Sequence, residues 1–373
     1  MKVEFFRHNI EESDIENVSK VLRSVFLTTG PITTEFEGKF SLYTGLKHTV
    51  GVNSCTAALH LALLALDIGP GDEVITTPMT FIATATSILH SGARPVFVDV
   101  DENTGLLDIN QVHKAITRRT KAMMPVHLYG NMVDMKGLRR IADDNGLKII
   151  EDCAHCIEGE RDGIRPGQLG DAACYSFYAT KNLTCGEGGA VATNDAELAG
   201  KLRLLRLHGM SKDAATRYSE YYKHWDMVML GWKYNMDDIH AALLVGQIEL
   251  LDGYWQRRNR IWQSYDEAFG NIANVKIPET QGKSARHLYT LWVSPDERDQ
   301  VLRKIQDKEI GVAVNYRAIH TLTYFSKVFG LNPEDYPIAN RIGESTVSLP
   351  LYPKLSEHEV SYVIDSIHGI LTR

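Results

Sequence analysis

Short apolar runs alternate with segments of helical periodicity over the first two thirds of the chain. In the helical segments apolar residues recur every three to four positions, whereas the short runs are rich in Val and Ile, as buried strands are. Helices are predicted over residues 54–66, 81–92, 108–116 and 135–146, and strands over residues 72–78, 95–100, 121–130, 147–152, 171–180 and 188–194. Strands separated by helices of about ten residues are typical of βαβ units and of a mainly parallel sheet covered on both faces.

The pattern changes near Asp237. A long helical stretch over residues 238–269, with a break predicted near Gly253, leads into shorter elements. These are predicted strands over residues 286–294 and 311–317 and predicted helices over residues 299–309 and 356–371. We therefore expect an α/β protein with two domains: a large domain with the parallel sheet over residues 1–245 and a smaller C-terminal α+β domain over residues 246–373.

The composition is that of an ordinary globular protein. Of the 373 residues, 44% are hydrophobic and 23% charged, and 47 acidic against 40 basic residues give a net charge of −7. Because nucleic acids and anionic membranes are attracted by a positive field, we expect neither kind of partner. The N-terminal residues are charged where a signal peptide needs an apolar run, and five cysteines suit a reducing compartment, so we expect a cytoplasmic protein.

Several residues with reactive side chains follow predicted strands. Asp152 closes the strand over residues 147–152, His127 lies near the end of the preceding one, and Ser176 and Lys181 follow the run DAACY. Ligands of open parallel sheets bind outside the carboxyl ends of the strands. Lys181 stands between this apolar run and the glycine-rich segment TCGEGG. A lysine at that point is either exposed or held neutral for chemistry, because burying an ammonium is costly.

The helix predicted to begin near Cys55 or Thr56 follows the small-residue turn GVNS. Its first amides can hold a phosphate, although a serine before a helix is more often simply an N-cap. Asp152 can likewise cap a helix, and His127 and Phe81 can be core residues. In combination, an acid at a strand end, a helix start suited to phosphate, an aromatic ring and a lysine are the parts that a pyridoxal phosphate (PLP) site needs.

Two other kinds of site are disfavoured. The segment CAHC, residues 153–156, has the spacing of redox and zinc sites, but no second ligand pair follows at a suitable spacing, since Cys174 and Cys185 are eleven residues apart. We expect packed thiols and no metal. A nicotinamide-dependent sugar reductase would carry G-x-G-x-x-G after its first strand, and GVNSCTAAL does not match it.

Four segments resemble the DegT/DnrJ/EryC1 family of nucleotide-sugar aminotransferases. They are TTGPITTEFE (28–37), EDCAHCIEG (151–159), SFYATKNLTCGEGG (176–189) and GWKYNMDDIHAAL (231–243), of which the third is the most specific. The likeness extends over nearly the whole chain. It implies the aspartate-aminotransferase (type I) fold, with a mainly parallel seven-stranded sheet in the large domain, and PLP as the cofactor.

The resemblance also implies how the cofactor ring is held. Lys181 would form the Schiff base with PLP, and Asp152 would pair with the pyridine nitrogen. His155 would hydrogen-bond the ring hydroxyl, and Phe81 would lie over the ring. One branch of the family replaces the lysine by histidine and carries out dehydration, so the presence of Lys181 favours transamination.

The phosphate and the quaternary structure follow from the same resemblance. Ser176 and the amides of Cys55 and Thr56 would hold the phosphate. Asn235 would reach the phosphate of the neighbouring subunit, which implies a homodimer with shared active sites.

For the substrates, the resemblance implies a nucleotide-linked keto sugar as amino acceptor and L-glutamate as the usual donor. We favour a UDP-linked 4-keto sugar, with a 3-keto sugar or a dTDP-sugar as the alternative, in surface polysaccharide or glycan biosynthesis. A non-catalytic regulatory protein on the same fold is the rival of a different class, and the intact lysine, aspartate and asparagine argue against it. The candidate substrate-binding residues are Thr29, Lys233, Arg317 and His320.

Overall fold

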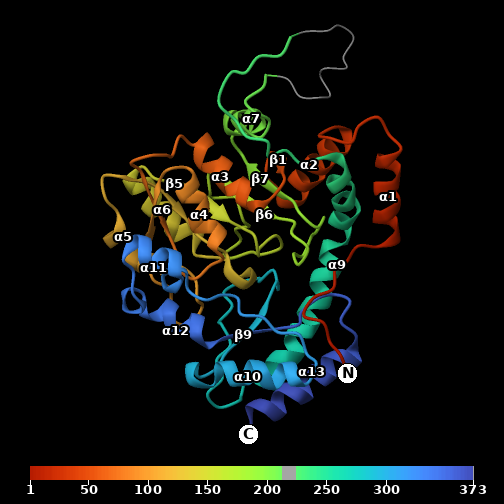
Figure 1. Cartoon of the computed structure of the whole chain (residues 1–373), viewed down its shortest axis with the longest axis vertical. Helices are drawn as coiled ribbons and strands as arrows, with labels where there is room; N and C mark the ends of the chain where they lie inside the picture. The colour runs from red at the N-terminus through yellow and green to blue at the C-terminus, as the bar shows by residue number, and fades with distance from the viewer. Residues whose placement is uncertain (212–223, 373) are drawn as a thin grey trace.

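A seven-stranded sheet forms the centre of the structure, a computed structural model that describes residues 1–211 and 224–372 (Figure 1). The strand order is β1-β7-β6-β5-β4-β2-β3. Strand β7 runs antiparallel to both of its neighbours, and the other four pairs are parallel. The predicted mainly parallel sheet is thus confirmed. Its strands are β1 (His48–Val52), β2 (Glu73–Thr76), β3 (Arg94–Phe97), β4 (Thr120–Met124), β5 (Lys148–Asp152), β6 (Ala172–Ser176) and β7 (Gly189–Thr193).

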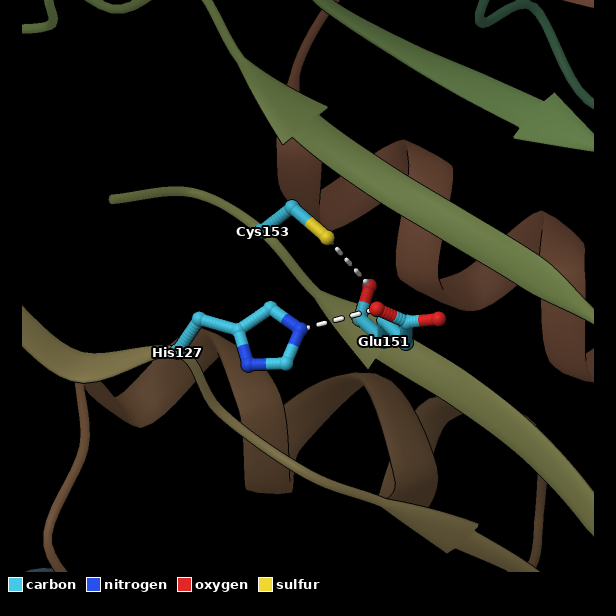
Figure 2. A group of neighbouring side chains, drawn as sticks. All are labelled: His127, Glu151 and Cys153. Atoms are coloured by element: carbon cyan, nitrogen blue, oxygen red, sulfur yellow. Dashed lines mark hydrogen bonds and ion pairs between the residues drawn. The ribbon is translucent and has the colours of Figure 1, made fainter. Parts of the chain in front are cut away.

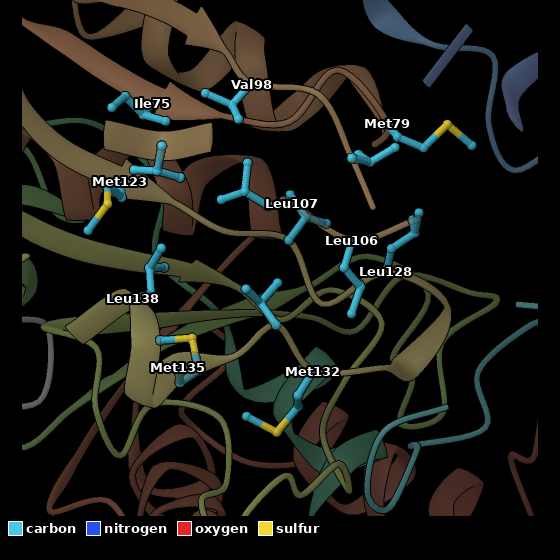
Figure 3. Close-up of a cluster of buried hydrophobic side chains, with 14 of the residues drawn as sticks. Ile75, Met79, Val98, Leu106, Leu107, Met123, Leu128, Met132, Met135 and Leu138 are labelled. Atoms are coloured by element: carbon cyan, nitrogen blue, oxygen red, sulfur yellow. The ribbon is translucent and has the colours of Figure 1, made fainter. Parts of the chain in front are cut away.

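Consecutive residues of the central strands point to opposite faces of the sheet. Val74 belongs to one apolar core and Ile75 to the other, and Met124 and Met123 divide in the same way. Because both faces are buried, these strands carry continuous apolar runs rather than an alternation. Figure 3 shows the core that contains Ile75 and Met123, where Leu138 also packs.

Helices cover both faces of the sheet. On one face α3 and α7 pack against the strands, and on the other α2, α6 and α9 do. The four helices predicted between residues 54 and 146 are confirmed as α3, α4, α5 and α6. The bounds are α1 (Glu12–Leu22), α2 (Pro31–Thr44), α3 (Cys55–Ala65), α4 (Ile82–His90), α5 (Ile109–Ala115), η1 (Leu128–Gly130), α6 (Met135–Asn145) and α7 (Ala196–Leu205).

The long helix α9 (Asp238–Phe269) runs from the sheet region into a smaller lobe that also holds both chain ends (Figure 1). It is continuous over 32 residues, so the predicted break near Gly253 is wrong. Apart from its own turns of the helix, no atom of the described chain lies within 4 Å of where a side chain at Gly253 would begin, and a glycine in a helix costs only about 1 kcal/mol relative to alanine. Packing of the helix on both lobes outweighs this cost. The proposed boundary between residues 245 and 246 lies inside α9.

The smaller lobe is built around a two-stranded antiparallel sheet. Its apolar core includes side chains of α9, both strands, α10 and α13. Among the described residues, no helix combines the length and apolarity needed to cross a bilayer. The elements are β8 (Tyr289–Trp292), α10 (Pro295–Asp307), η2 (Ile319–Thr321), α11 (Thr323–Phe329), η3 (Pro333–Asp335), α12 (Pro337–Ser345), β9 (Thr346–Leu349) and α13 (Glu357–Leu371).

Three predicted strands differ from the structure. The strand predicted over residues 311–317 is wrong, because this segment makes only an isolated bridge at Ala313 before it turns into a cavity. Strand β4 ends before Pro125, which has no N–H to continue the ladder. Strand β6 ends at Ser176, and the chain then forms a loop that returns to β7 through a hydrogen bond from the Phe177 N–H to the Gly188 carbonyl (2.8 Å).

Candidate functional site

A cavity of about 530 Å³ opens at the carboxyl ends of β5 and β6, where ligands of open α/β sheets bind. Segments that lie far apart in the sequence meet there. The wall includes seven of the residues that the sequence singled out, namely Cys55, Thr56, Phe81, Asp152, His155, Ser176 and Lys181. The structure therefore brings together the cofactor residues that were expected to act within one subunit. Asn235, which was expected to reach the cofactor of the neighbouring subunit, does not line this cavity.

Lys181 lies half-buried on the cavity wall, in the loop between β6 and β7. Burial lowers the pKa of Lys181 to about 8, although the nearby Cys55 and Asp152 partly oppose this effect. A substantial fraction of the amine is therefore neutral near pH 8. A neutral amine can act as a nucleophile and can carry protons, which a fully exposed lysine does poorly at that pH.

Asp152 is the buried acid of the cavity, with 5% of its surface exposed. One carboxylate oxygen accepts from the Thr84 hydroxyl (2.8 Å) and the other from the Ala154 N–H (3.1 Å). The bond to Ala154 is local, but no helix follows, so the alternative of a helix cap is wrong. Burial raises the pKa of Asp152, and no lysine or arginine of the described chain forms an ion pair with it. A cationic ring nitrogen would supply the missing positive charge.

The start of α3 faces the same cavity. The Ser54 hydroxyl accepts from the Ala57 N–H (3.1 Å), which confirms the N-cap, while the first amides of a helix have no partner within it. Gly189 approaches this turn so closely that a side chain would lie 2.6 Å from the Cys55 nitrogen, so only glycine fits. With the Ser176 hydroxyl on the same wall, the site suits a phosphate.

His155 is buried and neutral. Its Nδ1 accepts from the Tyr129 N–H (3.3 Å), so the proton resides on Nε2, which lies 3.0 Å from the Tyr316 hydroxyl. Burial and the positive charge of Lys181 hold the pKa of His155 well below its usual range. The imidazole can therefore donate a hydrogen bond toward the cavity without carrying a charge.

Phe81 is not a core residue, since 52% of its surface is exposed. It precedes α4 and lines the cavity, with its ring centroid 5.7 Å from that of Tyr316. The interpretation of Phe81 as core is wrong because the ring lies at the cavity mouth, where it can stack on a planar ligand.

Asn235, Lys233 and Thr29 form a separate cluster that does not line this cavity. The Asn235 amide donates to the Thr29 hydroxyl (2.7 Å) and accepts from the Lys233 ammonium (2.6 Å). Thr29 in turn donates to the Met236 carbonyl (2.5 Å). The cluster joins the segments TTGP and GWKYN, and Lys233 is exposed.

The two remaining substrate candidates lie on the smaller lobe. Arg317 is exposed next to the cavity residue Tyr316. His320 is fully buried: its Nε2 bonds the Pro333 carbonyl (3.4 Å), and its ring packs on Tyr336 with centroids 5.0 Å apart. The structure does not bring His320 to the cavity.

His127 is a hydrogen-bonded core histidine, as one of its two interpretations expected (Figure 2). Its Nδ1 accepts from the Val133 N–H (3.2 Å), so Nε2 donates to the Glu151 carboxylate (2.8 Å). Cys153, whose sulfur lies within 4.8 Å of both groups, donates to the Glu151 carbonyl (3.6 Å). The thiols of Cys153 and Cys156 are free and buried, as expected for packed cysteines.

Sequence reasoning missed several cavity residues. Tyr316 stands 161 positions from His155, and Phe5 comes from the N-terminal segment. Tyr178 and Glu187 flank Lys181 within the motif and could have been found there by position alone. Thr84 gave no signal, because its bond to Asp152 depends on where α4 lies relative to the end of β5 in the folded chain.

The lowered pKa of Lys181 has a consequence for the reaction of the cofactor-free protein with PLP. Because only the neutral amine attacks an aldehyde, the rate of attachment should rise with pH, with a midpoint near pH 8, and level off above it. Absorbance after rapid mixing with PLP, between about pH 6 and pH 10, measures this profile. A midpoint at or above about pH 10, the range of an exposed lysine, would show that burial does not act on the amine as described.

These groups fit PLP: an amine for the aldehyde, a buried carboxylate for the ring nitrogen, an exposed aromatic ring and a helix start for the phosphate. The comparisons with known proteins agree. Residues 8–368 match the DegT/DnrJ/EryC1/StrS aminotransferase family. The PMP form of Spr1654 from Streptococcus pneumoniae, which has also been solved in its PLP form, superimposes with a TM-score of 0.93 at 33% identity over 99% of both chains.

Two relatives by sequence bear on the pathway. The spore coat polysaccharide biosynthesis protein SpsC of Bacillus subtilis is 43% identical over 97% of this chain and 95% of its own. The UDP-4-amino-4-deoxy-L-arabinose–oxoglutarate aminotransferase of Shewanella sediminis is 36% identical over 98% and 97%. The chain therefore belongs to the DegT/DnrJ/EryC1/StrS aminotransferase family and is a PLP-dependent sugar aminotransferase of the type I fold.

Proposed function

We propose that the enzyme transfers the amino group of L-glutamate to a nucleotide-linked keto sugar, with Lys181 as the reactive amine. The observation that carries this proposal is the position of Lys181, with its pKa lowered to about 8, on the wall of the cavity that also holds the buried carboxylate of Asp152. When bound, PLP supplies an electron-withdrawing ring that makes the Cα–H bond of the amino donor acidic. Lys181 would hold the cofactor and, once displaced by the donor, would accept and return that proton through Nζ.

The other cavity residues would orient the cofactor. Asp152 would keep the ring nitrogen protonated, since a carboxylate next to a cation favours the charged form. His155 would donate from Nε2 to the ring hydroxyl, and Phe81 would stack on the ring. The phosphate would lie between the Ser176 hydroxyl and the amides of Cys55 and Thr56.

We further propose a homodimer in which each active site uses residues of both subunits. The cluster of Thr29, Lys233 and Asn235 supports this arrangement, because its polar groups do not line the cavity of their own chain. Asn235 would bind the cofactor phosphate across the interface, and Lys233 and Thr29 would face the substrate there. Arg317, exposed beside Tyr316, would face the substrate within its own subunit.

Asn235→Ala tests the shared site. Loss of one hydrogen bond from the amide to the charged phosphate should weaken PLP retention by about 10- to 100-fold, with the dimer intact, because such a bond contributes about 1.5–3 kcal/mol. Equilibrium dialysis against PLP, with sedimentation to follow the dimer, measures both quantities. Unchanged retention in an intact dimer would contradict the role of Asn235.

For the acceptor we propose a UDP-linked 4-keto sugar, with a 3-keto sugar or a dTDP-sugar as the alternative. The relative from Shewanella sediminis supports this choice by its name, which also pairs the sugar with oxoglutarate, the keto acid of glutamate. The buried free cysteines suit a cytoplasmic site of action.

A panel of keto-sugar nucleotides tests this proposal. The enzyme is first converted to its amine-bearing cofactor form with L-glutamate, and each sugar is then added. The UDP-4-keto sugar should restore the aldehyde form fastest. Faster conversion by a 3-keto or dTDP-linked sugar would favour the alternative, and conversion by none would contradict the sugar class proposed.

A further inference from the structure

Helix α9 clamps the loop that carries Lys181 at two places. Gln247 is fully buried and bonds Thr184 twice, accepting from its N–H (3.3 Å) and donating to its carbonyl (2.8 Å). Arg258 reaches the same loop through a chain of buried polar groups that ends at Asn182, the residue after Lys181. Gln247 and Arg258 are eleven residues apart, about three helical turns, and so lie on one face of α9.

The chain runs from Arg258 through Glu158 to Asn182. The Arg258 guanidinium donates to Glu158 Oε1 (2.5 Å), and both side chains are at most 1% exposed. Glu158 Oε2 accepts from Asn182 Nδ2 (2.9 Å), which also donates to the Ala285 carbonyl (3.0 Å). Asn182 thus has one orientation, because its NH₂ group faces two acceptors.

That orientation determines the proton position of the next group. Asn182 Oδ1 faces His287 Nδ1 (3.0 Å), so Nδ1 carries the proton and Nε2 the lone pair. The ring of His287 lies against the ring of His155, with centroids 4.4 Å apart. His155 lines the cavity, so Asn182 contacts the site on two sides: through the peptide bond to Lys181 and through the two imidazole rings.

The buried ion pair of Arg258 and Glu158 is costly to desolvate, so its contribution to stability alone does not explain it. Two charges withdrawn from water lose solvation that their mutual attraction barely restores, and apolar side chains of similar volume often stabilise a fold as well. A buried carboxylate does, however, fix the direction of an amide, as apolar side chains cannot.

We propose that Asn182 is a positioning residue that sets the place of Lys181 and the ring plane of His155, and that Glu158 and Arg258 act through it by fixing the orientation of its amide. This inference rests on the proposed role of Lys181 as the reactive amine.

Two variants test it. Glu158→Gln keeps the shape of the side chain but leaves one acceptor oxygen for two donors, Arg258 and Asn182. The Asn182 amide then loses its fixed orientation. Asn182→Leu removes all hydrogen bonds of this side chain and nearly keeps its volume. Each should lower kcat by about 10- to 100-fold, as small misplacements of reacting groups do, with KM within about twofold.

A second measurement uses the cofactor-free protein. In both variants the pH midpoint for attachment of PLP to Lys181 should rise above the wild-type value near 8, by at least about half a unit, because a loosened lysine is better hydrated. In the Asn182→Leu background, Glu158→Gln should change kcat by less than about twofold, since its effect passes through Asn182.

Glu37→Gln is the matched control. It breaks another largely buried pair, Glu37 with Arg206, which has no bond to the loop of Lys181. Both Glu37→Gln and Glu158→Gln should lower Tm, because each breaks a buried ion pair, but Glu37→Gln should leave kcat and the pH midpoint unchanged. Variants of Glu158 and Asn182 that lower only Tm, or that act additively, would overturn the positioning role. A wild-type protein that attaches PLP at another lysine would instead overturn the proposed function.

Discussion

Lys181→Ala should lower the rate of amino transfer by about 10⁴-fold or more, the upper end of what a general acid–base group contributes. The variant loses both the amine that holds the cofactor and the group that moves the proton. Its fold should persist, because the lysine lies half-buried on a cavity wall and forms no ion pair with any residue that the structure describes. Single-turnover mixing with L-glutamate, followed by the absorbance of bound cofactor, measures the effect.

Lys181→Arg is the matched control for charge. A guanidinium stays protonated at every accessible pH, so it can neither attack PLP nor carry the proton. We expect it to be as inactive as Lys181→Ala. If Lys181→Arg kept more than about a tenth of the wild-type rate, a positive charge rather than a neutral amine would be the requirement.

Asp152→Asn should lower kcat by about 10²- to 10⁴-fold. The substitution keeps the shape and leaves the ring nitrogen without a buried counter-charge, and breaking such a pair costs about 3–5 kcal/mol. Steady-state kinetics with saturating PLP separates this effect from cofactor loss.

Thr84→Val provides a graded comparison for Asp152. It removes one of the two hydrogen bonds to the carboxylate, of 2.8 Å, and leaves the charge in place. We expect a loss of about 10- to 100-fold in kcat, since a hydrogen bond to a charged group contributes about 1.5–3 kcal/mol. A smaller effect for Asp152→Asn than for Thr84→Val would contradict the assignment of Asp152 to the ring nitrogen.

Most of the large lobe could be predicted because its signals are local. Strands buried on both faces, such as the one that contains Ile149 and Ile150, show continuous apolar runs, and the helices between them show their own period. The break near Gly253 and the strand over residues 311–317 were wrong for a common reason. Both depend on contacts between distant segments: α9 packs on both lobes and continues past a glycine, and Asn315 and Tyr316 line the cavity, where Tyr316 bonds His155.

The residues of the site also divide into those marked by local sequence motifs and those that meet only in the folded chain. Lys181, Ser176 and Asp152 belong to continuous motifs at strand ends, so the sequence alone could single them out. Tyr316 and His287 could not be found, because they meet His155 only after the smaller lobe folds against the sheet. For Phe81 the sequence allowed two interpretations, a core residue or a ring that stacks on a ligand. An aromatic residue before a helix packs inward or faces a ligand according to what lies opposite.

Borohydride reduction of the purified enzyme with bound PLP identifies the amine that holds the cofactor. We expect the reduced protein to carry one cofactor per chain on the peptide that contains Lys181, with no other lysine labelled. A cofactor fixed to a different lysine, or a protein that takes up no PLP, would contradict this expectation.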